Sequence, residues 1–139
     1  MNKALLDTDT FSEITKGVDQ TVAAHARAYR AVFERYTISA VTFMEIVRGY
    51  QKKQAISQVQ SFLAAMASEE VLPLDQATAE LAGRIAGDLE RTGQPIGVAD
   101  PMIAAIAIVH GLELITGNTN HFERVRQLGH VLPLINWRI

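Results

Sequence analysis

The sequence contains no cysteine, which excludes a disulfide framework, a zinc site built on thiolates and a cysteine nucleophile. A long hydrophobic run is also missing: the longest, Met102 to Val109, is far too short to span a bilayer. The amino-terminal residues MNKALLDTDT contain neither the apolar segment nor the small-residue cleavage site of a secretory signal. From these absences we expect a soluble, cytoplasmic protein with no membrane partner.

An excess of positive charge is absent as well. The formal net charge is −2, so no overall basic field indicates a nucleic-acid ligand. Basic residues are nevertheless clustered within residues 27–35, 48–53 and 124–126. Such clusters are compatible with an RNA partner and equally with solvated helix faces. The chain has 139 residues, the size of one domain, and we expect a single domain over residues 1–139.

Short apolar segments alternate with amphipathic ones along the whole chain. In the amphipathic segments apolar residues recur three and four positions apart, as Phe43, Ile46 and Tyr50 do, and this spacing predicts helices. Strands separated by helices predict a three-layer α/β/α domain with a central, mainly parallel sheet. The expected strands are residues 3–7, 36–41, 71–74, 112–116 and 131–136. The expected helices are residues 8–17, 19–35, 42–53, 55–68, a segment after Asp75, 100–111 and a short one within 117–125.

Polar residues follow several of the expected strands, and parallel sheets bind their ligands at the carboxyl ends of strands. Asp7 comes directly after the first strand, and Asp9 lies two residues further on. Glu45 lies in the first turns of the helix that follows the second strand. Asp100 opens the most apolar helix, and Asn118 follows a late strand. Their oxygens should converge at one end of the sheet, where they suit a hard cation such as Mg²⁺ or Mn²⁺.

The three aspartates also have purely structural interpretations. Asp100 before Pro101 has the pattern of a helix N-cap followed by proline at the first helical position. Asp7 after an apolar strand suits a turn, because aspartate side chains bond the backbone that follows them. Asp9 suits the cap of the next helix. The residues alone leave both roles open for each of them.

The remaining candidates have alternatives of the same kind. Glu45 lies off the apolar stripe of its helix, which is typical of a solvent-exposed position. Asn118 suits a turn, and a histidine such as His121 is typically a surface residue. The hydroxyl group of Thr116 could support a carboxylate, although strand ends use threonine in any case.

Four segments nevertheless occur in a characteristic order: LLDTDT, ISAVTFMEIVRG, IGVADPMIAAIA and LITGNTNHFERV. With them the chain resembles a PIN-domain ribonuclease, and specifically a VapC toxin of a bacterial type II toxin–antitoxin pair. The resemblance covers nearly the whole chain, including LERTGQPIG before the third segment and INW near the end. It implies a Mg²⁺- or Mn²⁺-dependent endoribonuclease, a VapB-like antitoxin partner and a homodimer.

By their place in these segments, Asp7, Glu45 and Asp100 match the metal-binding acids of the family. Asn118 matches the asparagine or aspartate that helps to order the site, and His121 stands where family members often have a further acid. The implied mechanism is metal-assisted hydrolysis of an RNA phosphodiester. VapC toxins with the most similar motifs cleave initiator tRNA in its anticodon stem-loop, so tRNA is the expected substrate. Secondary site candidates are Asp9, Thr116, His121 and, as a phosphate contact, Arg48.

Two other functions compete with this interpretation. DTDT also fits the Asp-x-Asp-x-Thr opening of haloacid dehalogenase-type phosphatases, in which Asp7 would be a covalent nucleophile and Asp9 a general acid. That family then requires a lysine, and none follows Lys53. A catalytically impaired PIN-like binding module would retain the fold and lack a complete acid set, whereas the three matched acids are all present here.

Overall fold

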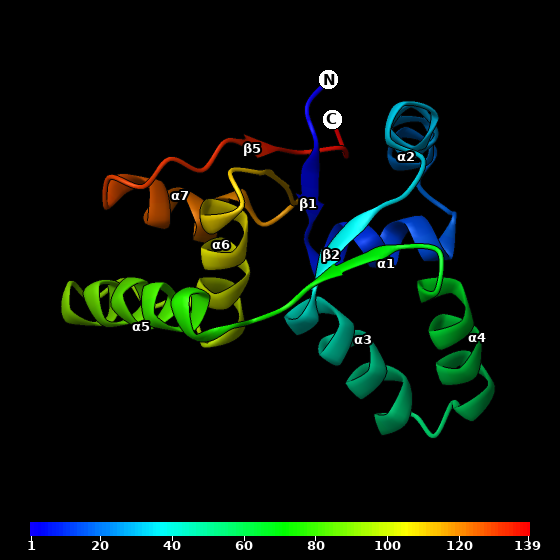
Figure 1. The fold of residues 1–139 in the computed structure, drawn as a ribbon, viewed down its shortest axis with the longest axis horizontal. Helices are drawn as coiled ribbons and strands as arrows, with labels where there is room; N and C mark the ends of the chain where they lie inside the picture. The colour runs from blue at the N-terminus through cyan, green and yellow to red at the C-terminus, as the bar shows by residue number, and fades with distance from the viewer.

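Five short strands and seven helices alternate along residues 1–139 in the computed structural model (Figure 1). Every expected strand and helix is present, with ends that differ from the expected ones by a few residues. The strands are β1 (Ala4–Leu6), β2 (Thr37–Ser39), β3 (Glu70–Leu72), β4 (Glu113–Ile115) and β5 (Leu134–Ile135). The helices are α1 (Thr8–Lys16), α2 (Gln20–Phe33), α3 (Ala40–Lys52), α4 (Ile56–Met66), α5 (Gln76–Arg91), α6 (Ala99–Val109) and α7 (Thr119–Gln127).

All the strand pairs are parallel, but they form two hydrogen-bonded sheets instead of one. The first sheet has the order β1-β4-β5, and the second pairs β2 with β3. Strand β2 lies beside the free edge of β1. At that edge the hydroxyl group of Tyr29, from α2, accepts a hydrogen bond from the Ala4 N–H (3.1 Å) and donates one to the Ala4 carbonyl (3.3 Å). The expected single ladder is interrupted here, and the polar groups of Ala4 at this edge pair with a side chain instead of with β2.

Strand β1 separates two hydrophobic cores. Successive residues of a strand face opposite sides: Leu5 lies in one core, and Ala4 and Leu6 lie in the other. The first core is completed by α5, α6 and α7, and the second by α1, α2 and α4. Figure 1 shows these two groups of helices on opposite sides of β1. The expected three-layer α/β/α arrangement is confirmed.

Helix α6 is buried along most of its length. Pro101 and residues 103–107 are all shielded from solvent, so this helix is fixed within the first core. It is also the most apolar helix of the chain, but none of the helices combines the length and the apolar character that a membrane span needs.

Two expectations about helix caps were wrong. Helix α6 begins at Ala99, so Asp100 lies inside the first turn and is not the N-cap. Helix α1 begins at Thr8, and its N-cap is Asp7, not Asp9, because the Asp7 carboxylate already accepts the Thr8 N–H at 2.8 Å. The Asp100 carboxylate is instead engaged by side chains of a later loop and helix, which leaves the first N–H groups of α6 without a side-chain cap.

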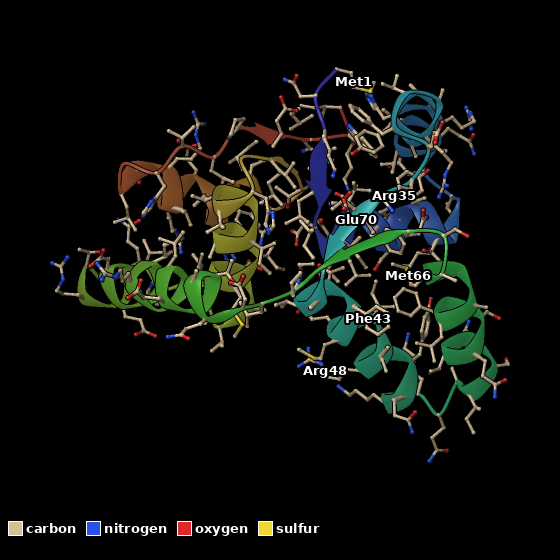
Figure 2. The ribbon with its side chains drawn as sticks, viewed as in Figure 1. Met1, Arg35, Phe43, Arg48, Met66 and Glu70 are labelled. Carbon is tan, nitrogen blue, oxygen red and sulfur yellow. The ribbon has the colours of Figure 1, made fainter.

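Contacts between side chains join the remaining elements to the second core. Phe43 of α3 lies against Phe62 of α4, with ring centroids 5.1 Å apart. Met66, at the end of α4, is buried in the same core. An ion pair between Arg35 and Glu70 (3.3 Å) links the segment after α2 to β3. Figure 2 shows Phe43 on α3 below the sheets and the Arg35–Glu70 pair beside β2.

Replacing Tyr29 by phenylalanine should lower the free energy of unfolding by about 1–3 kcal/mol, because the buried N–H and carbonyl of Ala4 would lose their partner. The measurement is urea denaturation at equilibrium. Tyr50→Phe, at a half-buried position on α3, is the control and should change the value by less than about 0.5 kcal/mol. Equal effects of the two substitutions would contradict a specific role for the Tyr29 hydroxyl group.

Candidate functional site

The site is centred on Asp7, a buried carboxylate at the carboxyl end of β1. Its side chain is only 4% exposed. One oxygen accepts the Thr8 N–H, and the other accepts the Thr116 hydroxyl group at 2.7 Å. Thr116 follows β4, the parallel neighbour of β1, so the carboxyl ends of two adjacent strands meet at this carboxylate. Parallel winding produces this juxtaposition across more than a hundred residues of sequence.

The ionised form of Asp7 is disfavoured by its surroundings. The pKa of Asp7 is raised from 3.8 to about 7, mainly by burial and also by the nearby charges of Asp9 and Asp100, against the hydrogen bonds from Thr116 and Thr8 that lower it. The three aspartates therefore lie close enough to repel one another. A cation placed among them would relieve this repulsion.

Asp100 is held by two residues that follow β4. His121 Nδ1 lies 2.8 Å from Asp100 Oδ2, and the amide nitrogen of Asn118 lies 3.3 Å from the same oxygen. A carboxylate only accepts hydrogen bonds, so in the tautomer that carries its proton on Nδ1, His121 donates a hydrogen bond to Asp100. The Asn118 backbone N–H donates to the hydroxyl group of Thr116 at 2.9 Å. The loop after β4 thus connects Asp100 to Asp7.

Asp9 holds the same loop from the other side. One of its oxygens accepts the Gly117 N–H at 2.9 Å, and the other accepts the Thr10 N–H at 2.7 Å. The guanidinium of Arg138 lies 3.7 Å from Asp9 and 3.7 Å from Glu13. A Cβ at position 117 would come within 2.2 Å of that guanidinium. A side chain at position 117 would therefore have to displace the end of the Arg138 side chain and would crowd Asp9.

Glu45 joins this network through a hydroxyl group. The Thr8 Oγ1 donates to Glu45 at 2.7 Å and also lies 2.9 Å from the hydroxyl group of Thr42. Glu45 is half-buried and makes no direct contact with another acid of the site. Thr8 follows Asp7 directly, so one residue positions both the first strand-end acid and the acid on α3.

Most of the candidates from the sequence are brought together, and one is not. Hydrogen bonds connect seven of them into one network: Asp7, Asp9, Glu45, Asp100, Thr116, Asn118 and His121. Arg48 is exposed and lines a separate hollow beside Phe43 and Val47. Sequence reasoning missed Thr8, Gly117 and Arg138. Only Thr8 had a signal, its place between the two aspartates of LLDTDT.

The site is rich in oxygen donors and carries no ready-made metal cage. No three of its acidic and histidine side chains are grouped tightly enough to hold an ion as they stand. In chemical type the donors fit a hard divalent cation, because carboxylates, hydroxyls and an amide are the ligands such ions bind. Asp9 and Asp100 add to the effect of burial in raising the pKa of Asp7, and a cation bound there would offset their repulsion.

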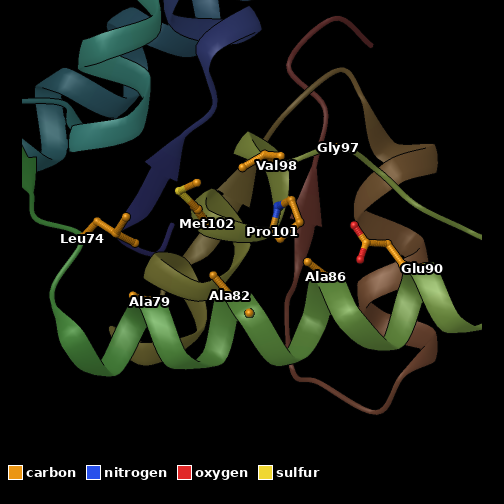
Figure 3. A pocket seen from close by; sticks show the side chains of 10 residues that line it. Leu74, Ala79, Ala82, Ala86, Glu90, Gly97, Val98, Pro101 and Met102 are labelled. Carbon is orange, nitrogen blue, oxygen red and sulfur yellow. The ribbon is translucent and has the colours of Figure 1, made fainter.

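A second, apolar hollow lies between α5 and α6 (Figure 3). It has a volume of about 240 Å³, and its walls include Ala82, Pro101 and Met102. Val98 at its rim is 72% exposed. Glu90 is its one acidic residue, and none of the networked side chains lines it. The hollow is therefore separate from the polar site.

Comparison with known proteins gives a consistent answer. Residues 4–128 match the PIN domain family. A relative from Shigella flexneri named tRNA(fMet)-specific endonuclease VapC is 40% identical over 63% of this chain and 67% of its own. A relative of the same name from Salmonella typhimurium is 33% identical over 90% and 93%. A chain in a crystal structure of DNA-bound VapBC from Salmonella typhimurium superimposes with a TM-score of 0.81 and 30% identity, and 99% of each chain is covered.

Replacing Asp7 by asparagine should stabilise the protein in chelator at neutral pH. In the unfolded chain Asp7 ionises near 3.8, whereas in the folded protein it ionises near 7. Its contribution to stability is therefore complete below about pH 4 and is lost as the pH rises toward 7. An asparagine side chain cannot ionise, so the variant should be more stable than the parent at pH 7.5, by at most about 4 kcal/mol.

The measurement is urea denaturation of both proteins at pH 4.5 and pH 7.5 with EDTA. The difference in free energy of unfolding should be larger at pH 7.5. Asp88→Asn on α5 is the control, because Asp88 is paired with Arg91 at the surface, and its effect should be small at both values. A variant at Asp7 that is less stable than the parent at pH 7.5 would show that burial of the charge is not unfavourable.

Proposed function

The chain belongs to the PIN domain family, and on that ground we propose that it is a metal-dependent endoribonuclease toxin of the VapC type. The observation that carries the proposal is the network at the carboxyl ends of β1 and β4, in which Asp9 and Asp100 lie close enough to the buried Asp7 to raise its pKa. The similarity to VapC endonucleases over most of the chain supports the same activity. We also infer one PIN domain over residues 1–139, because the two cores share the strands β1 and β4.

Asp7, Glu45 and Asp100 would hold Mg²⁺ or Mn²⁺, with Asp9 engaged in holding the loop. When bound, such an ion polarises the scissile phosphate and offsets negative charge on the attacking and leaving oxygens. The carboxylates supply oxygen ligands whose mutual repulsion favours ion binding. Because the pKa of Asp7 lies near 7, a cation beside it would favour its charged form, and ion binding would be coupled to the loss of a proton near neutral pH.

The surrounding residues position these ligands. Thr116 and the Thr8 N–H fix both oxygens of Asp7. His121 and Asn118 fix one oxygen of Asp100 and leave the other free to bind. The hydroxyl group of Thr8 fixes one oxygen of Glu45 in the same way. Residues that orient metal ligands in this way typically contribute about 10- to 100-fold in metal affinity or activity.

The proposed substrate is initiator tRNA, cut in its anticodon stem-loop. The support is that two relatives are named tRNA(fMet)-specific endonucleases. A loop whose bases are unstacked can reach such a site, whereas the grooves of an RNA duplex are recognised mostly by shape. Because its substrate is tRNA, we expect the protein to act in the cytoplasm.

The proposed partner is a VapB-like antitoxin, because the structural relative is part of a VapBC complex. The chemistry of the site agrees with such a partner, since an arginine or lysine from it would bind the clustered carboxylates and block them. We also propose a homodimer that covers the exposed apolar hollow between α5 and α6 (Figure 3).

Family membership argues against the phosphatase alternative, because the PIN match over residues 4–128 includes Asp7, Glu45 and Asp100. The alternative that stays open is a PIN-like binding module that does not cleave RNA. It differs from the proposal in one observable: it binds without metal-restored cleavage.

The test is cleavage of end-labelled initiator tRNA and elongator tRNA by the purified protein. We expect no cleavage in EDTA and restored cleavage when Mg²⁺ or Mn²⁺ is added, with initiator tRNA cut faster. Asp7→Asn, Glu45→Gln and Asp100→Asn should each reduce the cleavage rate by more than about 100-fold, since loss of residues that merely support a ligand already costs 10- to 100-fold.

Asp88→Asn is the matched control, an acid removed from the surface of α5, and should cleave like the parent. Cleavage by Asp7→Asn or Asp100→Asn at the parental rate would refute the assignment of the site. Binding of tRNA without cleavage under any ion would establish the binding module instead.

A further inference from the structure

A polar groove with a volume of about 230 Å³ lies between α1 and α3 and opens from the acidic site. It begins where Thr8 donates its hydrogen bond to Glu45. Both helices start at the carboxyl ends of neighbouring strands, which Figure 1 shows where β1 and β2 end. The groove therefore continues from the residues proposed to act on RNA.

Two matched rows of side chains form its walls. Along α1 the row is Thr8, Ser12 and Lys16, and along α3 it is Glu45, Gly49 and Lys53. Residues four apart lie on the same face of a helix, so each row is one continuous edge. Each covers about two helical turns, or roughly 12 Å. The acidic site lies at one end of both rows, and a lysine ends each of them.

The two lysines are not accounted for by contacts within the chain. Lys16 ends α1 and Lys53 caps α3, where a positive charge interacts favourably with the helix dipole. Neither forms an ion pair, whereas Lys3 binds Glu70 at 2.8 Å. The dipole explains each lysine singly, but not why both line one groove. Two amines at the end of a polar groove favour an anionic ligand.

The position of Gly49 also favours a ligand in this groove. It lies within α3, where glycine is among the least favourable helix residues. A Cβ at this position would meet no other atom of the chain within 4 Å, so internal packing does not require a glycine here. The missing side chain widens the groove between Glu45 and Lys53. Glycine at such a position permits close approach of a ligand to the backbone.

We propose that this groove binds the sugar-phosphate backbone of the RNA strand next to the bond that is cut, with Lys16 and Lys53 contacting its phosphates and Gly49 giving it room. The inference rests on the proposed endoribonuclease function and adds the path of the substrate. Phosphates fit the amine end of the groove, whereas a basic peptide tail from an antitoxin would be repelled there.

The first test is Gly49→Ala. Alanine should stabilise α3 and raise the melting temperature by about 2–4 °C, yet it should weaken RNA binding by roughly tenfold. Gly87→Ala on α5 is the matched control, because a Cβ there also meets nothing within 4 Å. It should raise the melting temperature and leave RNA binding unchanged. A more stable variant with weaker binding cannot be attributed to misfolding.

The second test replaces each lysine by glutamine. Binding is measured by fluorescence anisotropy of a labelled tRNA anticodon stem-loop at several salt concentrations, in an Asp100→Asn background that does not cut the RNA. Lys16→Gln and Lys53→Gln should each weaken binding and reduce the slope of log K against log salt by about 0.7. Lys52→Gln changes the charge equally at a residue that lies outside this groove and should keep the parental slope.

The outcomes separate this proposal from the one on which it rests. If the parent cleaves tRNA while the Gly49 and lysine variants bind like their controls, the groove proposal is overturned and the nuclease proposal stands. If the parent cleaves no RNA with either ion, both are overturned. If the variants bind RNA normally but lose affinity for the antitoxin, the groove belongs to a peptide and the proposal is also overturned.

Discussion

Asp7 carries a buried negative charge between two other carboxylates, and most of the polar contacts near it can be understood from that position. The N–H of Thr8 and the hydroxyl group of Thr116 each donate to it, and hydrogen bonds to a charged acceptor are stronger than neutral ones. They do not offset the burial and the repulsion fully, because the pKa still lies near 7. An asparagine here could accept the Thr8 N–H with its oxygen, but its amide nitrogen could not accept the Thr116 hydroxyl group, so that bond would have to reverse. A cation bound beside Asp7 would stabilise its charged form.

The frame around Asp7 prevents the acids from relieving their repulsion by moving apart. Strand β1 lies between two cores, and Asp7 follows it without an intervening residue. Asp100 lies in the first turn of a helix whose body is buried, and the loop after β4 ties Asp100 to Asp7 through Asn118 and Thr116. Hydrophobic burial, which acts far from the charges, thus holds them close together. Relief has to come from a bound ion or from a proton on Asp7.

The order of strands and helices and the position of the acids could be predicted from the sequence, because both depend on local patterns. Apolar periodicity located the elements, and parallel winding brought strand ends such as those before Asp7 and Thr116 together. Finer details could not be predicted. Asp100 has the local pattern of an N-cap, but its side chain is taken by His121, a partner twenty-one positions later. The contact of Arg138 with Asp9 joins residues near the two ends of the chain, so no local sequence pattern could predict it.

The groove between α1 and α3 is an example of a site in which a pattern shared by two helices indicates a ligand. A helical glycine alone is weak evidence, since Gly83 and Gly87 on α5 also have open space around them. A lysine at the end of a helix is equally ordinary. What distinguishes Gly49 is that it lies between Glu45 and Lys53 on one edge, opposite an edge of α1 with the same order of acid-site residue, small residue and lysine. The proposed RNA ligand accounts for the same order of residues on both helices. Such a strand would extend from the acids along the groove and place its phosphates near the lysines, about two helical turns away.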